Sequence, residues 1–238
     1  CGARGEVWLN TSEAEIQPAI SPLYEISKRL IGQILSLRAL DLANSLGKFL
    51  AKLGPANPDS LRISYHGEIA EKDTALISRT ALTGYLEAAR PEGQVNIVNS
   101  PAVAHDMGLE LVDSVINAKT EYNELIVAEL TKDGEKFRVS GTIIGKSPRI
   151  VEIDRLFVDT NIKGHFLIVR NDDRPGIVGL VGSSLGEAGL NIANLSLARN
   201  KTAGDALNVI ELDTAPGPEI IQSLSDAPGI ISVTAVKI

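Results

Sequence analysis

Side chains that could bind a small molecule gather between residues 171 and 176, which read Asn-Asp-Asp-Arg-Pro-Gly. Asp173 offers a carboxylate that can cap a helix, and Pro175 lies near the first helical turn, where a missing N–H costs nothing. Gly176 begins a glycine-rich run, but the G-x-G-x-x-G spacing of dinucleotide-binding loops does not occur in it. The segment is therefore a candidate for contact with a small ligand or another subunit, without a nucleotide signature.

The elements that must position this segment are a strand before it and a helix after it. Residues 165–170 have the period of a strand. Apolar residues then recur at helical spacing, at Ile177, Val181, Leu185 and Ala188. Gly189 ends this helix and Asn191 opens a new strand.

Four glycines mark the same helix: Gly176, Gly179, Gly182 and Gly186. Each interior glycine costs roughly 0.8–1 kcal/mol relative to alanine. A helix that keeps them is expected to gain from the close approach of its backbone to a sheet or to another chain.

The rest of the C-terminal sequence completes a repeating pattern. Residues 191–200 and 206–214 predict a hairpin around a glycine-containing turn, residues 219–227 a short helix, and residues 230–238 a last strand. The order βαββαβ over about 75 residues is that of the ferredoxin-like split βαβ. Residues 164–238 resemble an ACT domain, and Asp173-Arg174-Pro175-Gly176 with Asn191 resembles its ligand-loop pattern.

The sequence before residue 164 predicts runs of helix followed by runs of strand, which indicates an α+β domain with a mixed sheet. Residues 18–53 have one long helical pattern or two shorter ones, interrupted by Gly32 and Gly47. Asp73 is expected to cap a further helix, and Lys132-Asp133-Gly134-Glu135 to form a hairpin turn. The predicted strands are residues 61–70, 95–99, 109–116, 123–130, 136–144 and 149–157, with a small helix over 102–107.

This region also resembles a known family. Residues 40–53 (LDLANSLGKFLAKL), 65–70 (YHGEIA), 95–102 (VNIVNSPA) and 139–143 (VSGTI) resemble, in order, the intervening domain of D-3-phosphoglycerate dehydrogenase. In that enzyme's long form this allosteric substrate-binding domain directly precedes a C-terminal ACT domain. The expected division is a tail and linker helix over residues 1–39, the intervening domain over 40–160 and the ACT domain over 164–238.

The resemblance implies an effector site, usually for L-serine, between two paired ACT domains. By position its ligands are Asn171, Asp173 and Asn191, with backbone N–H groups around Arg174, Pro175 and Gly176. An ammonium group suits the side-chain oxygens, and a carboxylate suits the N–H groups at a helix start. Asn171 departs from the histidine or tyrosine often found there. In the alternative interpretation, Asp173 caps a helix, Asn191 closes a turn, and neither binds a ligand.

A second anion site is a further hypothesis. Arg149, Arg155 and Lys163 lie in the last predicted strand and the linker, and the family can bind its phosphorylated substrate near this stretch. Arginine matches phosphate bidentately. Asn161 stands where the family leads us to expect an arginine. A solvated basic face is the alternative interpretation.

The sequence has no residue pattern typical of a metal site or a catalytic site. His66, His105 and His165 are isolated and lack metal-ligand spacing, and no nucleophile–base arrangement indicates a catalytic site. The net charge of −7 and the 4% of aromatic residues disfavour nucleic-acid partners and anionic membrane surfaces. No apolar run approaches the ~20 residues that span a bilayer. A lone cysteine, Cys1, fits a reducing compartment, so a cytoplasmic protein is expected.

The sequence thus predicts the regulatory portion of D-3-phosphoglycerate dehydrogenase, with no cofactor or catalytic residue of its own. As the resemblance implies, NAD and 3-phosphoglycerate oxidation belong to absent catalytic domains, and the partners are an amino acid and a second ACT domain. Since residue 1 is not methionine, we expect a fragment or a processed product; a lipidated cysteine is the alternative. Two further alternatives are the small subunit of an iron–sulfur L-serine dehydratase and a free-standing ACT regulator.

Overall fold

The structure is a computed structural model, and it describes residues 37–71, 73–116, 120–200 and 204–238. The predicted tail, the predicted helix before residue 37 and most of the predicted turn at 201–205 lie outside these residues. The described chain contains two sheets, one of six strands and one of four. We call the parts built on them the six-stranded domain and the four-stranded domain.

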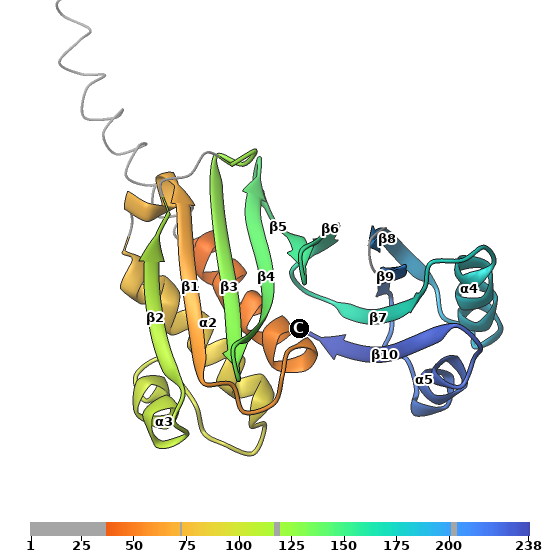
Figure 1. Cartoon of the computed structure of the whole chain (residues 1–238), viewed down its shortest axis with the longest axis horizontal. Coiled ribbons are helices and arrows are strands. Elements are labelled where there is room, and N and C mark those ends of the chain that lie inside the picture. Colours follow the sequence, from red (N-terminus) through yellow and green to blue (C-terminus); the bar gives the residue numbers. More distant parts are fainter. Residues whose placement is uncertain (1–36, 72, 117–119, 201–203) are drawn as a thin grey trace, which may run out of the picture. The chain divides into compact units, whose positions relative to one another are not determined.

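The six-stranded sheet has the order β2-β1-β3-β4-β5-β6 (Figure 1). Strand β1 pairs with β2 in parallel, while the other neighbours are antiparallel, so the predicted mixed sheet is confirmed. Helices α2 and α3 lie in the chain between β1 and β2, as a parallel pair requires. The elements are β1 (Ser60–Gly67), a 3-10 turn (Glu68–Glu71), α2 (Thr74–Ala89), α3 (Ser100–Asp106), β2 (Glu110–Val115), β3 (Glu124–Lys132), β4 (Glu135–Ile144), β5 (Ser147–Ile153) and β6 (Leu156–Asn161).

One helix spans residues 37–53, and both it and α2 lie on the same side of this sheet (Figure 1). Gly47 does not interrupt the helix. A Cβ at Gly47 would collide with the backbone of Ala81 in α2, and a Cβ at Gly84 in α2 would collide with Asn44. The two glycines therefore let the helices cross at close range. Asp73 caps α2 by accepting a hydrogen bond from the N–H of Leu76, as predicted.

Two strand predictions are wrong in this domain. Residues 95–99 form a turn, because Asn96 and Asn99 use their side chains to bond the local backbone and so compete with extended structure. The single strand predicted over residues 149–157 is two strands, β5 and β6. Asp154 and Arg155 between them have φ values of 51° and 65°, which reverse the chain in a tight hairpin.

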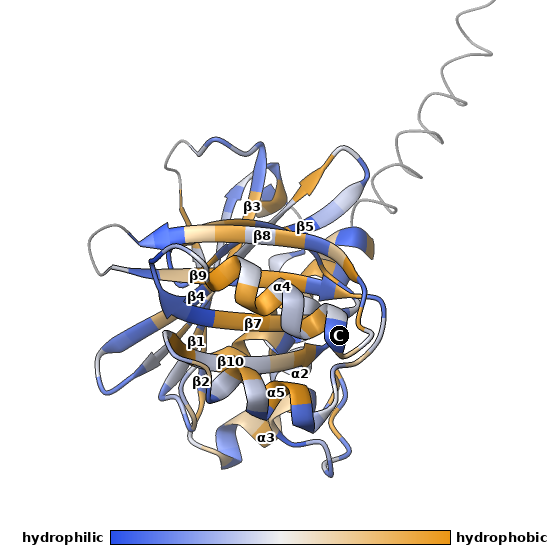
Figure 2. Ribbon diagram, turned by 90° about the vertical axis from the view of Figure 1, so that its right-hand side faces the viewer, coloured by the Kyte–Doolittle hydropathy of each residue, from blue (hydrophilic) through white to orange (hydrophobic). Residues whose placement is uncertain are grey.

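The four-stranded sheet has the order β10-β7-β9-β8, which is the ferredoxin-like topology that the sequence predicts. Its two helices cover one face of the sheet (Figure 2). Val181 and Leu185 of α4 pack there against Leu167 of β7 and Ile210 of β9. The elements are β7 (His165–Asp172), α4 (Ile177–Glu187), β8 (Ile192–Asn200), β9 (Asp205–Leu212), α5 (Pro218–Ser225) and β10 (Ile230–Lys237).

Candidate functional site

The loop between β7 and α4 carries most of the residues that the sequence singles out. Strand β7 runs two residues further than predicted, so Asn171 belongs to the sheet and is only 3% exposed. Its amide oxygen accepts a hydrogen bond from Nδ2 of Asn208 (2.6 Å), and its own Nδ2 donates to the carbonyl of Asp172 (2.6 Å). Asn171 therefore stabilises the β7–α4 loop from its buried position in the sheet.

Asn208 is a site residue that our sequence reasoning did not identify. It lies in β9, is 1% exposed, and has an amide oxygen with no hydrogen-bond partner among the described residues. A polar residue between Leu207 and Val209 of a strand was the available signal, because buried polar groups are normally paired. Asn171 and Asn208 face each other across the β7–β9 ladder, where Asn208 pairs with Val169 and Asn171 with Ala206.

Asp173 does not cap α4, so that prediction is wrong. The N-cap is Gly176, at φ 94°, and it supplies no side-chain hydrogen bond. The carboxylate of Asp173 instead accepts from Nε of Arg199 in β8, at 2.8 Å and 2.9 Å to its two oxygens. Its backbone N–H donates to Gly204. The left-handed glycine thus starts the helix, and Asp173 is turned back toward the sheet.

Arg174 fastens the same loop to the turn before β10. Its Nη2 donates to the carbonyl oxygen of Pro228 (2.5 Å), and its guanidinium lies against Gly229, at φ 88°. Pro175 and Gly176 then lead into α4 on the exposed side of the domain. The first turn of α4 therefore presents its N–H groups without a side-chain cap, as an anion-binding helix start does.

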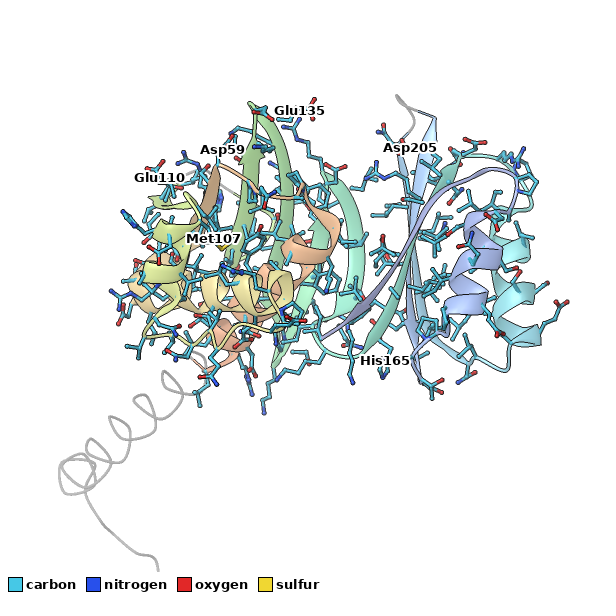
Figure 3. All side chains as sticks on the ribbon, turned by 90° about the horizontal axis from the view of Figure 1, so that it is seen from below. Asp59, Met107, Glu110, Glu135, His165 and Asp205 are labelled. Atoms are coloured by element: carbon cyan, nitrogen blue, oxygen red, sulfur yellow. The ribbon has the colours of Figure 1, made fainter. Side chains whose placement is uncertain are left out.

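Asn191 lies at the other end of the domain. It precedes β8, and its Nδ2 donates to the carboxylate of Asp213 (2.6 Å). Register places Asp172 beside Asp205 and His165 beside Leu212. Figure 3 labels Asp205 and His165 at opposite ends of this sheet. One copy of the chain thus brings Asn171 and Asp173–Gly176 together but does not bring Asn191 to them.

The three residues of the hypothetical anion site are also spread out. Arg149, near the start of β5, donates to Asp159 (2.7 Å) and Asn161 (2.5 Å). Arg155 lies in the turn after β5, at that strand's other end, and Lys163 contacts Asp41 (3.2 Å). The structure therefore does not gather the three cations at one point.

A buried carboxylate bonds the same asparagine, Asn161, as Arg149 does. Glu211 of β9 is 7% exposed and accepts from Oγ1 of Thr160 (2.6 Å), from the backbone and side chain of Asn161 (both 2.7 Å) and from Asn194 (3.2 Å). Burial opposes ionisation, but these donors outweigh it and hold the pKa of Glu211 below its ordinary value. A phosphate at Arg149 would face Asp159 and this second negative charge.

Within the six-stranded domain a serine, a carboxylate and a tyrosine are joined by hydrogen bonds. The hydroxyl of Ser78 in α2 bonds Asp113 of β2 and the hydroxyl of Tyr65 in β1. Ser78 is 1% exposed, and burial raises the pKa of Tyr65. The group ties the helix to two strands, and its serine and tyrosine are buried while Asp113 is exposed. Among the described residues, no three His, Cys, Asp or Glu side chains gather as metal ligands.

Comparison with known families gives the six-stranded domain its identity. Residues 38–154 match the D-3-phosphoglycerate dehydrogenase intervening domain. This part of the chain belongs to that family. The matched range covers the helix from residue 38 to 53 and the sheet up to the β5–β6 turn. The resemblance seen in the sequence is confirmed over this range.

Several similar proteins share a name, D-3-phosphoglycerate dehydrogenase. The relatives from Methanocaldococcus jannaschii and Archaeoglobus fulgidus are each 30% identical, over 197 and 202 residues, and that from Bacillus subtilis is 28% identical over 198. These matches cover 83–84% of this chain but 37–38% of each relative. A match of 197 residues is longer than residues 1–154, so the likeness continues beyond the intervening domain into the four-stranded domain.

The described residues include no helix long and apolar enough to cross a membrane.

Proposed function

We propose that this chain is the regulatory portion of a D-3-phosphoglycerate dehydrogenase and binds an amino-acid effector, L-serine first among them. The site would lie at a seam between two copies of the four-stranded domain, which would serve as an ACT domain. A family intervening domain followed by a ferredoxin-like unit supports this assignment. So does the likeness to dehydrogenases that extends past residue 154.

The main support for this interface between two copies is the face of α4 that bears Gly179, Gly182 and Gly186. A Cβ built at Gly179, Gly182 or Gly186 would meet nothing within 4 Å among the described residues. Packing on the chain's own sheet therefore does not explain glycines that each cost roughly 0.8–1 kcal/mol in a helix. Val178 and Leu180 on the same helix are 43% and 37% exposed. A second copy of this chain against that face would use both the missing side chains and the exposed apolar ones.

The separation of Asn191 from the β7–α4 loop agrees with a shared site. A two-fold axis places the same patch of each copy against its counterpart, so the loop of one copy can meet residues of the other. Asn191 would then come from the partner copy. The ligand's ammonium would face Asp173 and amide oxygens, and its carboxylate would take N–H donors around this loop, among them those at the uncapped start of α4.

Regulation would follow from a difference in affinity. If serine binds one arrangement of the paired domains better than another, it shifts the assembly by that difference and no more, typically 1–3 kcal/mol. NAD and the oxidation of 3-phosphoglycerate would belong to catalytic domains that accompany this portion. The chain by itself is expected to have no turnover, since it carries no glycine-rich nucleotide loop.

Calorimetric titration of the purified chain with L-serine tests the proposal. We expect saturable heat in a preparation shown to be dimeric by sedimentation, and no saturable heat from D-serine, whose groups cannot all meet the same partners. A dimer that gives no heat with millimolar L-serine would contradict the proposed function.

A further inference from the structure

Arg199 is an exposed cation that the β7–α4 loop holds in a fixed place. It lies near the end of the edge strand β8, and its side chain is 56% exposed, whereas that of Asp173 is 20% exposed. Nε of Arg199 donates to both carboxylate oxygens of Asp173, at 2.8 Å and 2.9 Å. The side of the guanidinium nearest the chain is therefore anchored.

The other side of the same guanidinium is free of the residues that the structure describes. Its two terminal nitrogens make no hydrogen bond or ion pair with any residue that the structure describes. They carry four N–H groups in one plane, and this fork matches a carboxylate bidentately. An arginine restrained at Nε loses less freedom when it binds through the fork, so the anchor prepares it for an anion.

We propose that Arg199, positioned by Asp173, binds the carboxylate of the amino-acid effector. This inference rests on the proposed function. It adds Arg199 to the residues that contact the effector, and the sequence pattern did not identify this residue. Asp173 then has two tasks: two of its lone pairs hold Arg199, and the others remain for the ligand's ammonium. The pair presents opposite charges side by side, and a zwitterion carries the complementary pair.

Alternatively, Arg199 is only a latch that holds the β7–α4 loop to β8. Replacing a latch would also weaken ligand binding. The two roles differ in which ligands lose affinity when Arg199 is replaced. A latch acts on every ligand alike, whereas a carboxylate receptor acts only on ligands that carry a carboxylate. L-Serinamide keeps the ammonium and hydroxyl of L-serine and replaces the carboxylate by a neutral amide, so it separates them.

The experiment titrates dimeric wild-type chain, Arg199→Gln, Arg199→Lys and the control Arg90→Gln with L-serine and with L-serinamide. Arg90 is an exposed arginine at the end of α2 in the other domain. We expect Arg199→Gln to weaken L-serine binding by ~10- to 100-fold, the range of a charge-assisted hydrogen bond, and to change L-serinamide binding by less than about twofold. Arg199→Lys, which keeps the charge and loses the fork, should fall between, and Arg90→Gln should match wild type.

Equal losses for both ligands in Arg199→Gln would show a latch and overturn the inference, as would unchanged binding of L-serine. Either result leaves the proposed function standing, because wild type still binds. Wild type that binds neither ligand would instead overturn the proposed function, and the role of Arg199 with it.

Discussion

Asn208, Arg199 and Gly176 show how much of the candidate site is decided by residues other than those with reactive groups. Asn208 holds Asn171 within the sheet, Arg199 turns Asp173 away from the helix start, and Gly176 at φ 94° replaces the side-chain cap. Each acts through geometry: a buried amide pair, a fixed ion pair and a left-handed backbone. The β7–α4 loop is therefore shaped from three sides before any ligand arrives.

Gly182 of α4 gives a prediction at this scale. Gly182→Ala should stabilise the isolated chain by roughly 0.8–1 kcal/mol, because alanine is the better helix former and its Cβ meets open space. The same Cβ should weaken self-association, since the proposed seam needs the bare backbone. Urea unfolding at low concentration and sedimentation equilibrium measure the two effects.

Gly217→Ala is the matched control, because that glycine also has open space around its Cβ but lies at the start of α5, at φ −72°. It should leave self-association unchanged. Dimerisation of Gly182→Ala as tight as that of wild type would show that this face of α4 is not at the seam.

The place of this loop between a strand and a helix could be predicted from the sequence, but the contacts of its side chains could not. The pattern around Pro175 indicated a ligand loop, and its position between a strand and a helix is confirmed. The cap at Asp173 was wrong because Arg199, 26 residues later in the chain, offers its carboxylate a full positive charge. A single sequence gives no sign of such a partner, since it becomes a neighbour only when β8 and β9 pair.

Among the elements, β6 and β9 are joined by the buried carboxylate of Glu211, and this junction should respond to pH. Its pKa is lowered in the folded chain, so Glu211 adds stability that is present above its unfolded pKa and lost as pH falls through the folded value. Glu211→Gln should remove that part of the acid dependence. At neutral pH the variant should be less stable by about 1–3 kcal/mol, because the NH2 group that replaces one carboxylate oxygen cannot accept the hydrogen bond from Nδ2 of Asn161.

Urea unfolding of wild type and Glu211→Gln between neutral pH and pH below 4 checks this, with the exposed Glu187→Gln as the control. The difference between wild type and Glu211→Gln should shrink as the pH falls. A difference that stays constant would mean that folding does not lower the pKa of Glu211.

Helices and strands followed the sequence pattern where apolar periodicity governed and departed from it where local polar chemistry did. The predicted turn at Asp133-Gly134 and the cap at Asp73 are confirmed, because each depends on residues next to it. The strand over 95–99 failed since asparagine side chains bond the backbone there. The turn at Asp154-Arg155 was missed because Arg155, unlike glycine, is not a usual residue at positive φ in a hairpin turn.

At the scale of the whole molecule, the described chain combines a family intervening domain with a four-stranded domain of ferredoxin-like topology. The α+β class and both sheet types could be predicted, since the order of helical and extended patterns sets them. The shared site could only be hypothesised. Its residues lie at two ends of one domain, and their meeting depends on a second copy that no single chain contains.

The most direct measurement is a mixing titration of two variants that each lack half of the proposed shared site. Asp173→Ala and Asn191→Ala should each bind L-serine poorly alone. After equal amounts are mixed and re-equilibrated, about one quarter of the wild-type capacity should return, because half of the pairs are mixed and each regains one of two sites. No regained capacity in a mixture shown to contain mixed dimers would contradict a site shared between copies.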